Sequence, residues 1–151
     1  MANRVEHALT EEILPLLQKE CFVTIATIDH EKQIPNVNAI SWVYALDPQT
    51  VRFSIAARSR IVKNINENSG VVLTLIANDS TYSISGSAKV VEENIENLPI
   101  KLALIELTIE EVRDVMFYGA KVTRFPSYEK TYDAEAAAKL DLQVMNKLKK
   151  K

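Results

Sequence analysis

The chain has 151 residues, of which 47% are hydrophobic and 25% charged, and its formal net charge is −2. This length suits one domain with a substantial core, and the near-neutral charge argues against a general attraction to nucleic acid or to a membrane surface. No apolar run reaches the ~18 residues of a transmembrane helix, and the polar, acidic N-terminal segment is unlike a signal peptide. The lone Cys21 excludes an intramolecular disulfide. We therefore expect a cytoplasmic protein with a buried, unreactive thiol.

The first part of the chain reads as a short helix followed by strands. Thr10 suits a helix N-cap, but Pro15 argues against a long helix. Runs rich in β-branched and alternating apolar residues then predict three strands, at residues 21–28, 35–46 and 50–56. The connections between them are short polar turns, which implies antiparallel hairpins.

The stretch RSRIVKNINEN, residues 58–68, predicts one helix among these strands. Ile61, Val62 and Ile65 recur at helical spacing, Ser59 is a natural N-cap, and Ser69-Gly70 is expected to form the C-cap.

The remaining elements complete a mainly β protein with flanking helices. Strands are expected at residues 71–76 and 81–91, and as one long bent strand over 101–119, whose period is ambiguous. Asp133 is expected to cap a C-terminal helix that extends to about residue 149. Six strands with one inserted helix predict a small antiparallel barrel in a single domain, 1–151, with the barrel at about 21–120.

Several common chemistries find no support in the sequence. Three glycines cannot build a Rossmann or P-loop motif. His7 and His30 are the only histidines, which argues against a Ser-His-Asp arrangement or a His-rich metal site. Asp29-His30-Glu31 offers ligand types for a metal, but a solvated hairpin tip is the favoured interpretation. We expect no metal, and we assign no catalytic residue.

The basic helix offers an anion site. With Ser59 as its cap, the N–H groups of residues 60–62 would point out of the first turn, where the helix dipole also favours an anion. Arg58 and Arg60 add guanidinium groups that suit a phosphate, whereas Lys63 lies about one turn further and ranks below them. The alternative is a solvated helix whose cations meet surface acids.

A platform for a flat ring is expected beside this site. Trp42, Tyr44 and Phe53 supply aromatic groups on the neighbouring strands, and N-x-x-S-W, Asn38–Trp42, supplies polar groups along one of them. Together with the phosphate site, this pattern suits a mononucleotide cofactor. The alternative, which is stronger from the local pattern, is that these aromatics are core or interface residues.

At this point the chain resembles the flavin mononucleotide (FMN)-binding split barrels, the pyridoxamine 5'-phosphate oxidase-like proteins. The segments "IPNVNAISWVY", "VRFSIAARSRIVKNINENSGVVLTLI" and "TYSISGSAKVV" are similar to that family's motifs and occur in its order, over roughly residues 9–120. The resemblance implies a six-stranded antiparallel split β-barrel, a homodimer with the flavin near the subunit interface, and FMN as cofactor. The cofactor-binding residues that it implies are Asn38, Ala39, Ile40, Ser41, Ser54, Ile55, Arg58, Ser59, Arg60, Lys63 and Thr81.

Departures from the family pattern narrow the expected function. Ile61 stands at a phosphate-binding Lys position and Ile55 at a Thr position, and no Arg-x-His substrate motif follows. We therefore expect not a true pyridoxamine 5'-phosphate oxidase but a flavin-dependent oxidoreductase acting on an unknown small molecule. The alternatives are a non-catalytic flavin carrier or stress-related binding protein, and a split barrel that uses deazaflavin or haem. The aromatic stretch 117–128 is expected to cover the ring, a partner subunit or the barrel edge.

Overall fold

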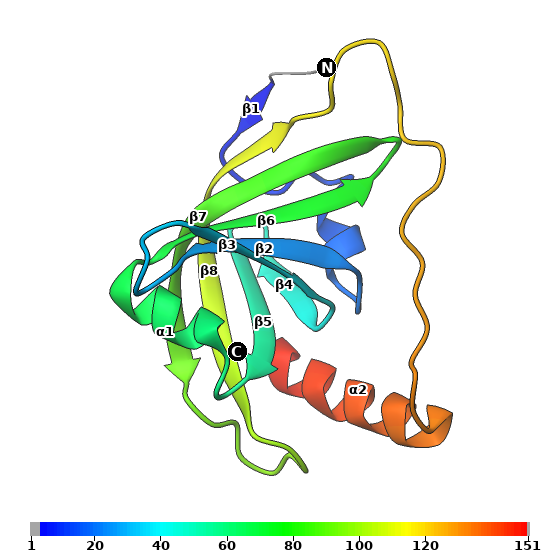
Figure 1. The fold of residues 1–151 in the computed structure, drawn as a ribbon. Helices are drawn as coiled ribbons and strands as arrows, with labels where there is room; N and C mark the ends of the chain where they lie inside the picture. Colours follow the sequence, from blue (N-terminus) through cyan, green and yellow to red (C-terminus); the bar gives the residue numbers. More distant parts are fainter. Residues whose placement is uncertain (1–3, 151) are drawn as a thin grey trace.

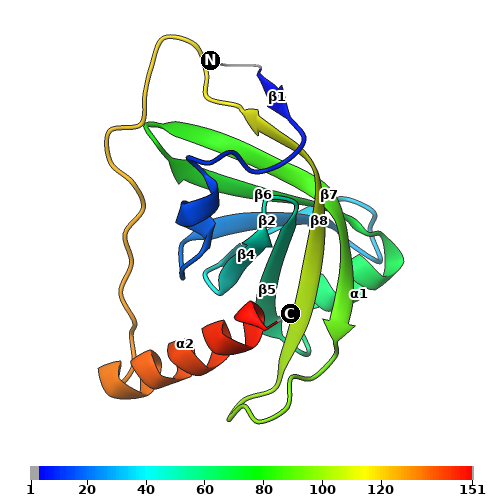
Figure 2. The same cartoon turned by 180° about the vertical axis from the view of Figure 1, so that it is seen from behind.

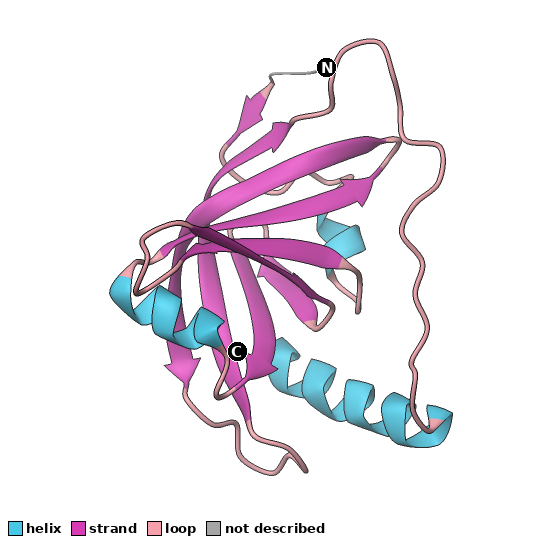
Figure 3. Cartoon of the chain, in the orientation of Figure 1, coloured by secondary structure: helices cyan, strands magenta, loops and turns pink. Residues whose placement is uncertain are grey.

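The computed structural model describes residues 4–150 and is mainly antiparallel β-structure with flanking helices (Figure 1 and Figure 3). The strands are β1 (Val5–Glu6), β2 (Val23–Ile28), β3 (Pro35–Ile40), β4 (Val43–Asp47), β5 (Thr50–Ala56), β6 (Gly70–Ala77), β7 (Ser80–Glu92) and β8 (Leu102–Asp114). The helices are the 3₁₀ helix η1 (Leu14–Leu17), α1 (Arg60–Glu67) and α2 (Ala134–Lys149). The fold class expected from the sequence is confirmed.

Within the described residues the strands form one sheet of eight, in the order β3-β2-β6-β7-β8-β5-β4, with β1 paired to β8. The sheet curls around its core, but β3 and β4 do not pair, so it is not closed (Figure 1). The strand count differs from six for two reasons. β1 was not expected, and the strand expected at 35–46 is broken at Ser41, whose carbonyl oxygen accepts from the N–H groups of both Cys21 and Val43, each at 3.1 Å.

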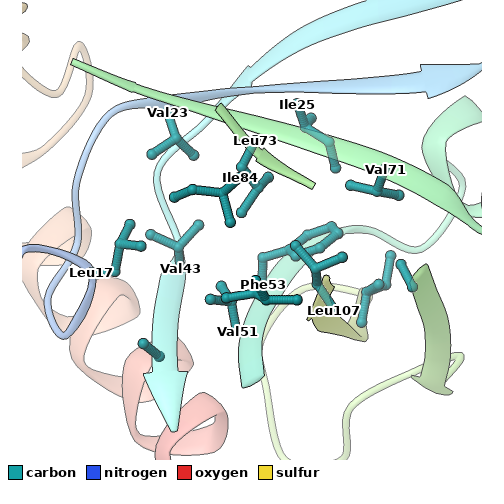
Figure 4. Close-up of a cluster of buried hydrophobic side chains, with 14 of the residues drawn as sticks. Leu17, Val23, Ile25, Val43, Val51, Phe53, Val71, Leu73, Ile84 and Leu107 are labelled. Atoms are coloured by element: carbon teal, nitrogen blue, oxygen red, sulfur yellow. The ribbon is translucent and has the colours of Figure 1, made fainter. Parts of the chain in front are cut away.

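The main core lies inside the curled sheet. Alternate residues of β2, β4, β5, β6, β7 and β8 point inward, as the period-two pattern predicts. Figure 4 shows this cluster, which contains Phe53 of β5 together with Val23, Ile25, Leu73 and other aliphatic side chains. The 3₁₀ helix η1, where the sequence predicted a Pro-limited helix, adds the fully buried Leu17.

Helix α1 closes onto this core, as its apolar spacing predicts. Ile61, Val62 and Ile65 are buried in the main cluster. The expected C-cap at Ser69-Gly70 is wrong, because the helix ends at Glu67, the Asn68 N–H donates to the Asn64 carbonyl, and Gly70 already begins β6. The short connection between α1 and β6 leaves no room for a glycine-capped turn.

Helix α2 covers a second, smaller apolar cluster on the outer face of the sheet. Asp133 caps the helix as expected, its side chain accepting from the Glu135 N–H. The buried Val144, Met145 and Leu148 of α2 lie against Leu102 and Leu104 of β8. No helix within residues 4–150 is long and apolar enough to cross a membrane.

Residues 115–133, here called the strap, link β8 to α2 and contain no helix or strand. Figures 1 and 2 show the strap running along one side of the molecule, from the end of β8 down to the start of α2. Two backbone hydrogen bonds hold its first part. The Val115 N–H donates to the Thr81 carbonyl oxygen, and the Val122 N–H donates to the Asp79 carbonyl oxygen.

Candidate functional site

The start of α1 is capped as the sequence predicts, but its backbone donors are mostly used. The Ser59 hydroxyl accepts from the Ile61 N–H at 3.1 Å, and the Ser59 carbonyl oxygen accepts from the Val62 N–H at 3.1 Å. Of the three N–H groups expected to face a ligand, two are therefore satisfied within the turn. An anion at this point would be held chiefly by side chains.

The Arg60 side chain supplies the main positive charge and is oriented by a buried acid. A guanidinium nitrogen of Arg60 lies 3.2 Å from Asp29 Oδ1, and its side chain is 59% exposed while that of Asp29 is 3% exposed. The other oxygen of Asp29 accepts from the backbone N–H groups of Glu31 and Lys32 at 3.1 and 2.8 Å. The guanidinium is thus fixed at one edge and open to solvent at the others.

Hydrogen bonding keeps Asp29 ionised. The bond from the Lys32 N–H lowers the pKa of the Asp29 carboxyl, and the Glu31 N–H and the charge of Arg60 act in the same direction. The interpretation of this hairpin as a solvated tip is therefore wrong for Asp29, which is 2% exposed, although residues 31–33 beyond it are exposed.

Asn64 ties α1 to the same hairpin. It is fully buried, its Nδ2 donates to Thr27 Oγ1 at 2.9 Å, and its Oδ1 accepts from the backbone N–H of His30 at 2.9 Å. The His30 ring nitrogen Nδ1 lies 2.9 Å from the same oxygen, so it carries the proton there. These contacts fix the first turns of α1 relative to β2 and β3.

Arg58 and Lys63 complete the cationic group. Both are exposed, and among the described residues neither is paired with a carboxylate. Arg58 lies in the turn before Ser59, two residues from Arg60, whereas Lys63 lies one helical turn further along. The two arginines therefore lie close together at the start of α1, and the ranking of Lys63 below them stays a prediction.

The residues predicted along the next strand lie on β3, at the open edge of the sheet. Asn38 pairs with the buried Ile25, and Ile40 with the buried Val23, so both side chains share the core-side face of β2 on which α1 docks. Ala39 pairs with Thr24 on the opposite face. Because the outer edge of β3 has no strand partner in the described chain, its backbone N–H and C=O groups are free to bind a ligand.

The spacing between α1 and the far end of β3 is suited to an elongated ligand. Arg60 binds Asp29, directly after Ile28, which pairs with Pro35 at the start of β3. The five steps from Pro35 to Ile40 span about 17 Å in an extended strand. A phosphate at Arg60 and a ring near Ile40 would therefore lie at opposite ends of one strand.

The side chains predicted on β5 and around it are largely used by the protein itself. Ser54 is buried and its hydroxyl donates to the Ala103 carbonyl at 3.0 Å, and Ile55 belongs to the main core. The expected aromatic platform is wrong: Phe53 lies in the main core, and Trp42 and Tyr44 pack beneath α2. The alternative interpretation of these aromatics as core residues is confirmed.

Thr81 lies apart from the other predicted residues. It pairs with Ile76 near the tip of the β6–β7 hairpin, whereas α1 joins β6 at Gly70, paired with Ser87. Six strand residues separate these two pairs, which corresponds to about 20 Å. The Thr81 hydroxyl instead lies 3.8 Å from the Met116 sulfur, so Thr81 is not near the α1 end of this chain.

A small cavity lies at the Ile40 end of β3, where the strap passes. Its volume is about 280 Å³, and it is lined by Phe22, Ala39, Ile40, Ser41, Tyr128 and Lys130. The sequence indicated the three residues on the β3 side and, within the aromatic stretch 117–128, also Tyr128, but it did not indicate Phe22 or Lys130. Lys130 reaches the cavity through the path of a segment without periodic structure, which local patterns do not predict.

Lys130 anchors the strap at this cavity. Its ammonium contacts Glu20 Oε2 at 2.6 Å and Asp141 Oδ1 at 3.0 Å, and it lies about 6 Å from the ring centres of Trp42 and Tyr128. Burial alone would lower the pKa of Lys130, but the hydrogen bonds to the two carboxylates outweigh it and raise that pKa.

Cys21 begins the strand region beside this cavity and is half-buried. Burial raises the pKa of its thiol to about 11, so little thiolate forms at neutral pH. The structure therefore agrees with an unreactive cysteine.

Comparison with known proteins identifies related folds. A family model described as pyridoxamine 5'-phosphate oxidase matches residues 9–116. HupZ of Group A Streptococcus superimposes with a TM-score of 0.60 at 18% identity, covering 75% of this chain and 98% of that one. A putative pyridoxamine 5'-phosphate oxidase of Lactobacillus delbrueckii gives 0.59 at 23% identity, covering 70% and 93%, and an F420 reductase gives 0.57 at 17%, covering 69% and 98%. No curated protein is a significant sequence match.

Proposed function

The chain belongs to the pyridoxamine 5'-phosphate oxidase family, and on this premise we propose that it binds FMN and acts as an oxidoreductase on a small molecule. The proposal includes a cytoplasmic location, in keeping with a single, unpaired cysteine. The family's fold alone does not specify a reaction, so the proposal depends on the site.

The observation that carries the proposal is the exposed guanidinium of Arg60, held by buried Asp29 at one end of the open strand β3. Arginine binds phosphate through parallel hydrogen bonds, and Arg58 adds a second cation nearby. The Ser59 cap and the Asn64 contacts fix this end of α1, so the cations are arranged before a ligand arrives.

The remaining predicted residues would act on the ring and its linker. The free edge of β3 offers backbone hydrogen bonds, and Asn38 offers an amide, on the face that α1 shares. FMN, when bound, would supply hydride or electron transfer, while the protein places the ring and excludes water from one side of it. Ser54 and Ile55 would contribute to this site only from within the core, because their side chains are buried.

We further propose a homodimer that covers β3. This strand is an edge of the sheet and carries large exposed apolar groups, with Val37 65% exposed and Ile34 next to the strand 54% exposed. An uncovered apolar edge invites association. A second subunit would cover this edge, and would allow Thr81 of one protomer to contact the flavin bound by the other.

Val37→Lys should then shift the protein from dimer to monomer, as measured by size-exclusion chromatography with light scattering.

A second cofactor is retained because one structural neighbour is an F420 reductase. F420 is a deazaflavin with its own phosphate, so the same arginines would suit it. A flavin carrier without turnover also fits the same site.

FMN titration of the purified protein tests the proposal. We expect quenching of flavin fluorescence with saturable binding, and Arg60→Ala should weaken FMN binding by about tenfold to a hundredfold, the value of one charged hydrogen-bonded contact. Riboflavin, which lacks the phosphate, should bind both forms equally. Lys63→Ala is the matched control on the same helix, and it should have a smaller effect. Equal FMN affinity in the Arg60→Ala and unsubstituted proteins would refute the phosphate assignment.

A second assay distinguishes an enzyme from a carrier. Only an enzyme should oxidise reduced nicotinamide steadily when an electron acceptor is present.

A further inference from the structure

The cavity between β3 and the strap has a composition that selects a particular ligand. Phe22 and Tyr128 face it with ring centres 6.4 Å apart and planes inclined by 44°, and Ala39 and Ile40 add apolar surface. A flat, apolar molecule fits such walls. The volume of about 280 Å³ is sufficient for a ligand about the size of two fused rings.

The Lys130 side chain supplies a hydrogen-bond donor to the cavity. Lys130 carries three N–H donors, of which Glu20 and Asp141 each take one. The third has no carboxylate partner in the described chain. Ser41, whose hydroxyl can donate or accept, also lines the cavity. A ligand that accepts a hydrogen bond, such as a carbonyl compound, would satisfy the Lys130 donor.

The charges around the cavity exclude an anion. The single ammonium of Lys130 lies between two carboxylates, so these three groups together carry one negative charge. A carboxylate or phosphate placed beside Lys130 would approach both Glu20 and Asp141, and their repulsion would offset its attraction to the ammonium. The acceptor that this site takes is therefore uncharged.

We propose that this cavity is a binding site for a small, uncharged, planar aromatic carbonyl compound, with Tyr128 as an aromatic wall and Lys130 as its hydrogen-bond donor. The cavity lies about 17 Å along β3 from the end where Arg60 lies. Its role as the substrate end of a flavin site rests on the proposed function, whereas the binding itself does not require a flavin.

Binding to the flavin-free protein tests this assignment. Three probes of similar shape differ in one group. 2-Acetonaphthone is a neutral hydrogen-bond acceptor, 2-naphthoate is an anion, and 2-ethylnaphthalene has no hydrogen-bond acceptor. Ligand-observed saturation-transfer NMR and calorimetry measure their affinities. We expect 2-acetonaphthone to bind about tenfold more tightly than either of the others, because it alone satisfies the Lys130 donor without adding charge.

Substitution of the strap locates the site. Tyr128→Ala should weaken 2-acetonaphthone binding by about tenfold, the value of one aromatic contact with its buried area. Tyr132→Ala is the matched control, since Tyr132 lies on the same strap, is 50% exposed against 46% for Tyr128, and does not line the cavity. Both tyrosines are exposed enough for folding to survive.

Two results would overturn the proposal: 2-naphthoate binding as tightly as 2-acetonaphthone, or equal losses in the two tyrosine variants. FMN titration of the same samples keeps the two proposals apart. If the unsubstituted protein binds FMN but not 2-acetonaphthone, the cavity assignment alone is contradicted, and if it binds 2-acetonaphthone but not FMN, the flavin site alone is contradicted.

Discussion

Asn64→Ala should destabilise the protein far more than its place on a short surface helix suggests. The substitution removes three contacts of 2.9 Å, to Thr27 Oγ1 and to the backbone N–H and ring Nδ1 of His30. A net value of 0.5–1.5 kcal/mol per hydrogen bond gives about 3 kcal/mol in total. Replacing Asn by Ala within a helix returns about 0.5 kcal/mol of helix propensity, so the expected net loss is about 2.5 kcal/mol.

Urea unfolding followed by circular dichroism measures this loss, with Asn66→Ala as the control. Asn66 lies on the exposed side of the same helix, and its side chain forms no hydrogen bond within residues 4–150. Its replacement should therefore show only the propensity gain, a stabilisation of about 0.5 kcal/mol. A thermal scan should place the Asn64→Ala midpoint roughly 5–10 °C below that of the unsubstituted protein.

A double-mutant cycle tests whether the loss arises from the contact with β2. Thr27→Val leaves the Asn64 Nδ2 donor unsatisfied and should cost about 1–2 kcal/mol, but little more once Asn64 is already alanine. If Asn64→Ala costs less than about 1 kcal/mol, or if the two losses simply add, the hydrogen bonds do not hold α1 in place and the reasoning fails.

Three further predictions concern the sheet, the hairpin and the strap. Gly86→Ala should prevent folding or lower the free energy of unfolding in urea by more than about 3 kcal/mol, because an added Cβ would lie 1.9 Å from a β8 carbonyl oxygen. Gly70→Ala is the control: its Cβ would meet only a side-chain atom at 3.2 Å, so this substitution should be nearly neutral. The pKa of Asp29 in the folded protein lies below its value of about 3.9 in the unfolded chain. The ionised Asp29 carboxylate therefore stabilises the folded protein above about pH 3.9, and this stabilisation is lost as the pH falls through the folded-state pKa. The difference in urea midpoint between the unsubstituted protein and Asp29→Asn should accordingly become smaller from about pH 7 to about pH 3. Lys130→Met leaves two carboxylates without their shared partner and should speed tryptic cleavage within the strap, and unchanged cleavage would mean that other contacts hold it.

The sequence was most informative where one short segment determines its own structure. The Ser59 cap, the spacing of Ile61, Val62 and Ile65, and the Asp133 cap all depend on neighbours within one helical turn, and all are confirmed. The alternating strands also depend on local pattern, so the fold class followed. The family resemblance then added the order of the motifs, which no single motif determines.

The failures depend on contacts between distant residues. The strand break at Ser41 arises because its carbonyl oxygen accepts a hydrogen bond from the N–H of Cys21, twenty residues earlier. Asp29 is buried because the side chains of Arg60 and Asn36, from α1 and β3, contact its carboxylate. The local sequence Asp29-His30-Glu31 does not indicate these contacts. Trp42 had two interpretations that local pattern could not separate, and α2, about a hundred residues away, determined its environment through the bond to Asp141.

The same distinction separates the two ends of the proposed site. At the α1 end the cations are adjacent in sequence, so local pattern could predict them, and only their orientation by Asp29 required the structure. At the cavity end Phe22, Ser41 and Tyr128 come from three separate segments. Specificity for a substrate would therefore depend on the strap, while affinity for a phosphate-bearing cofactor would depend on α1. Changes in the strap should alter which small molecule binds and leave FMN affinity nearly constant, because the strap's cavity residues lie at the other end of β3 from Arg60.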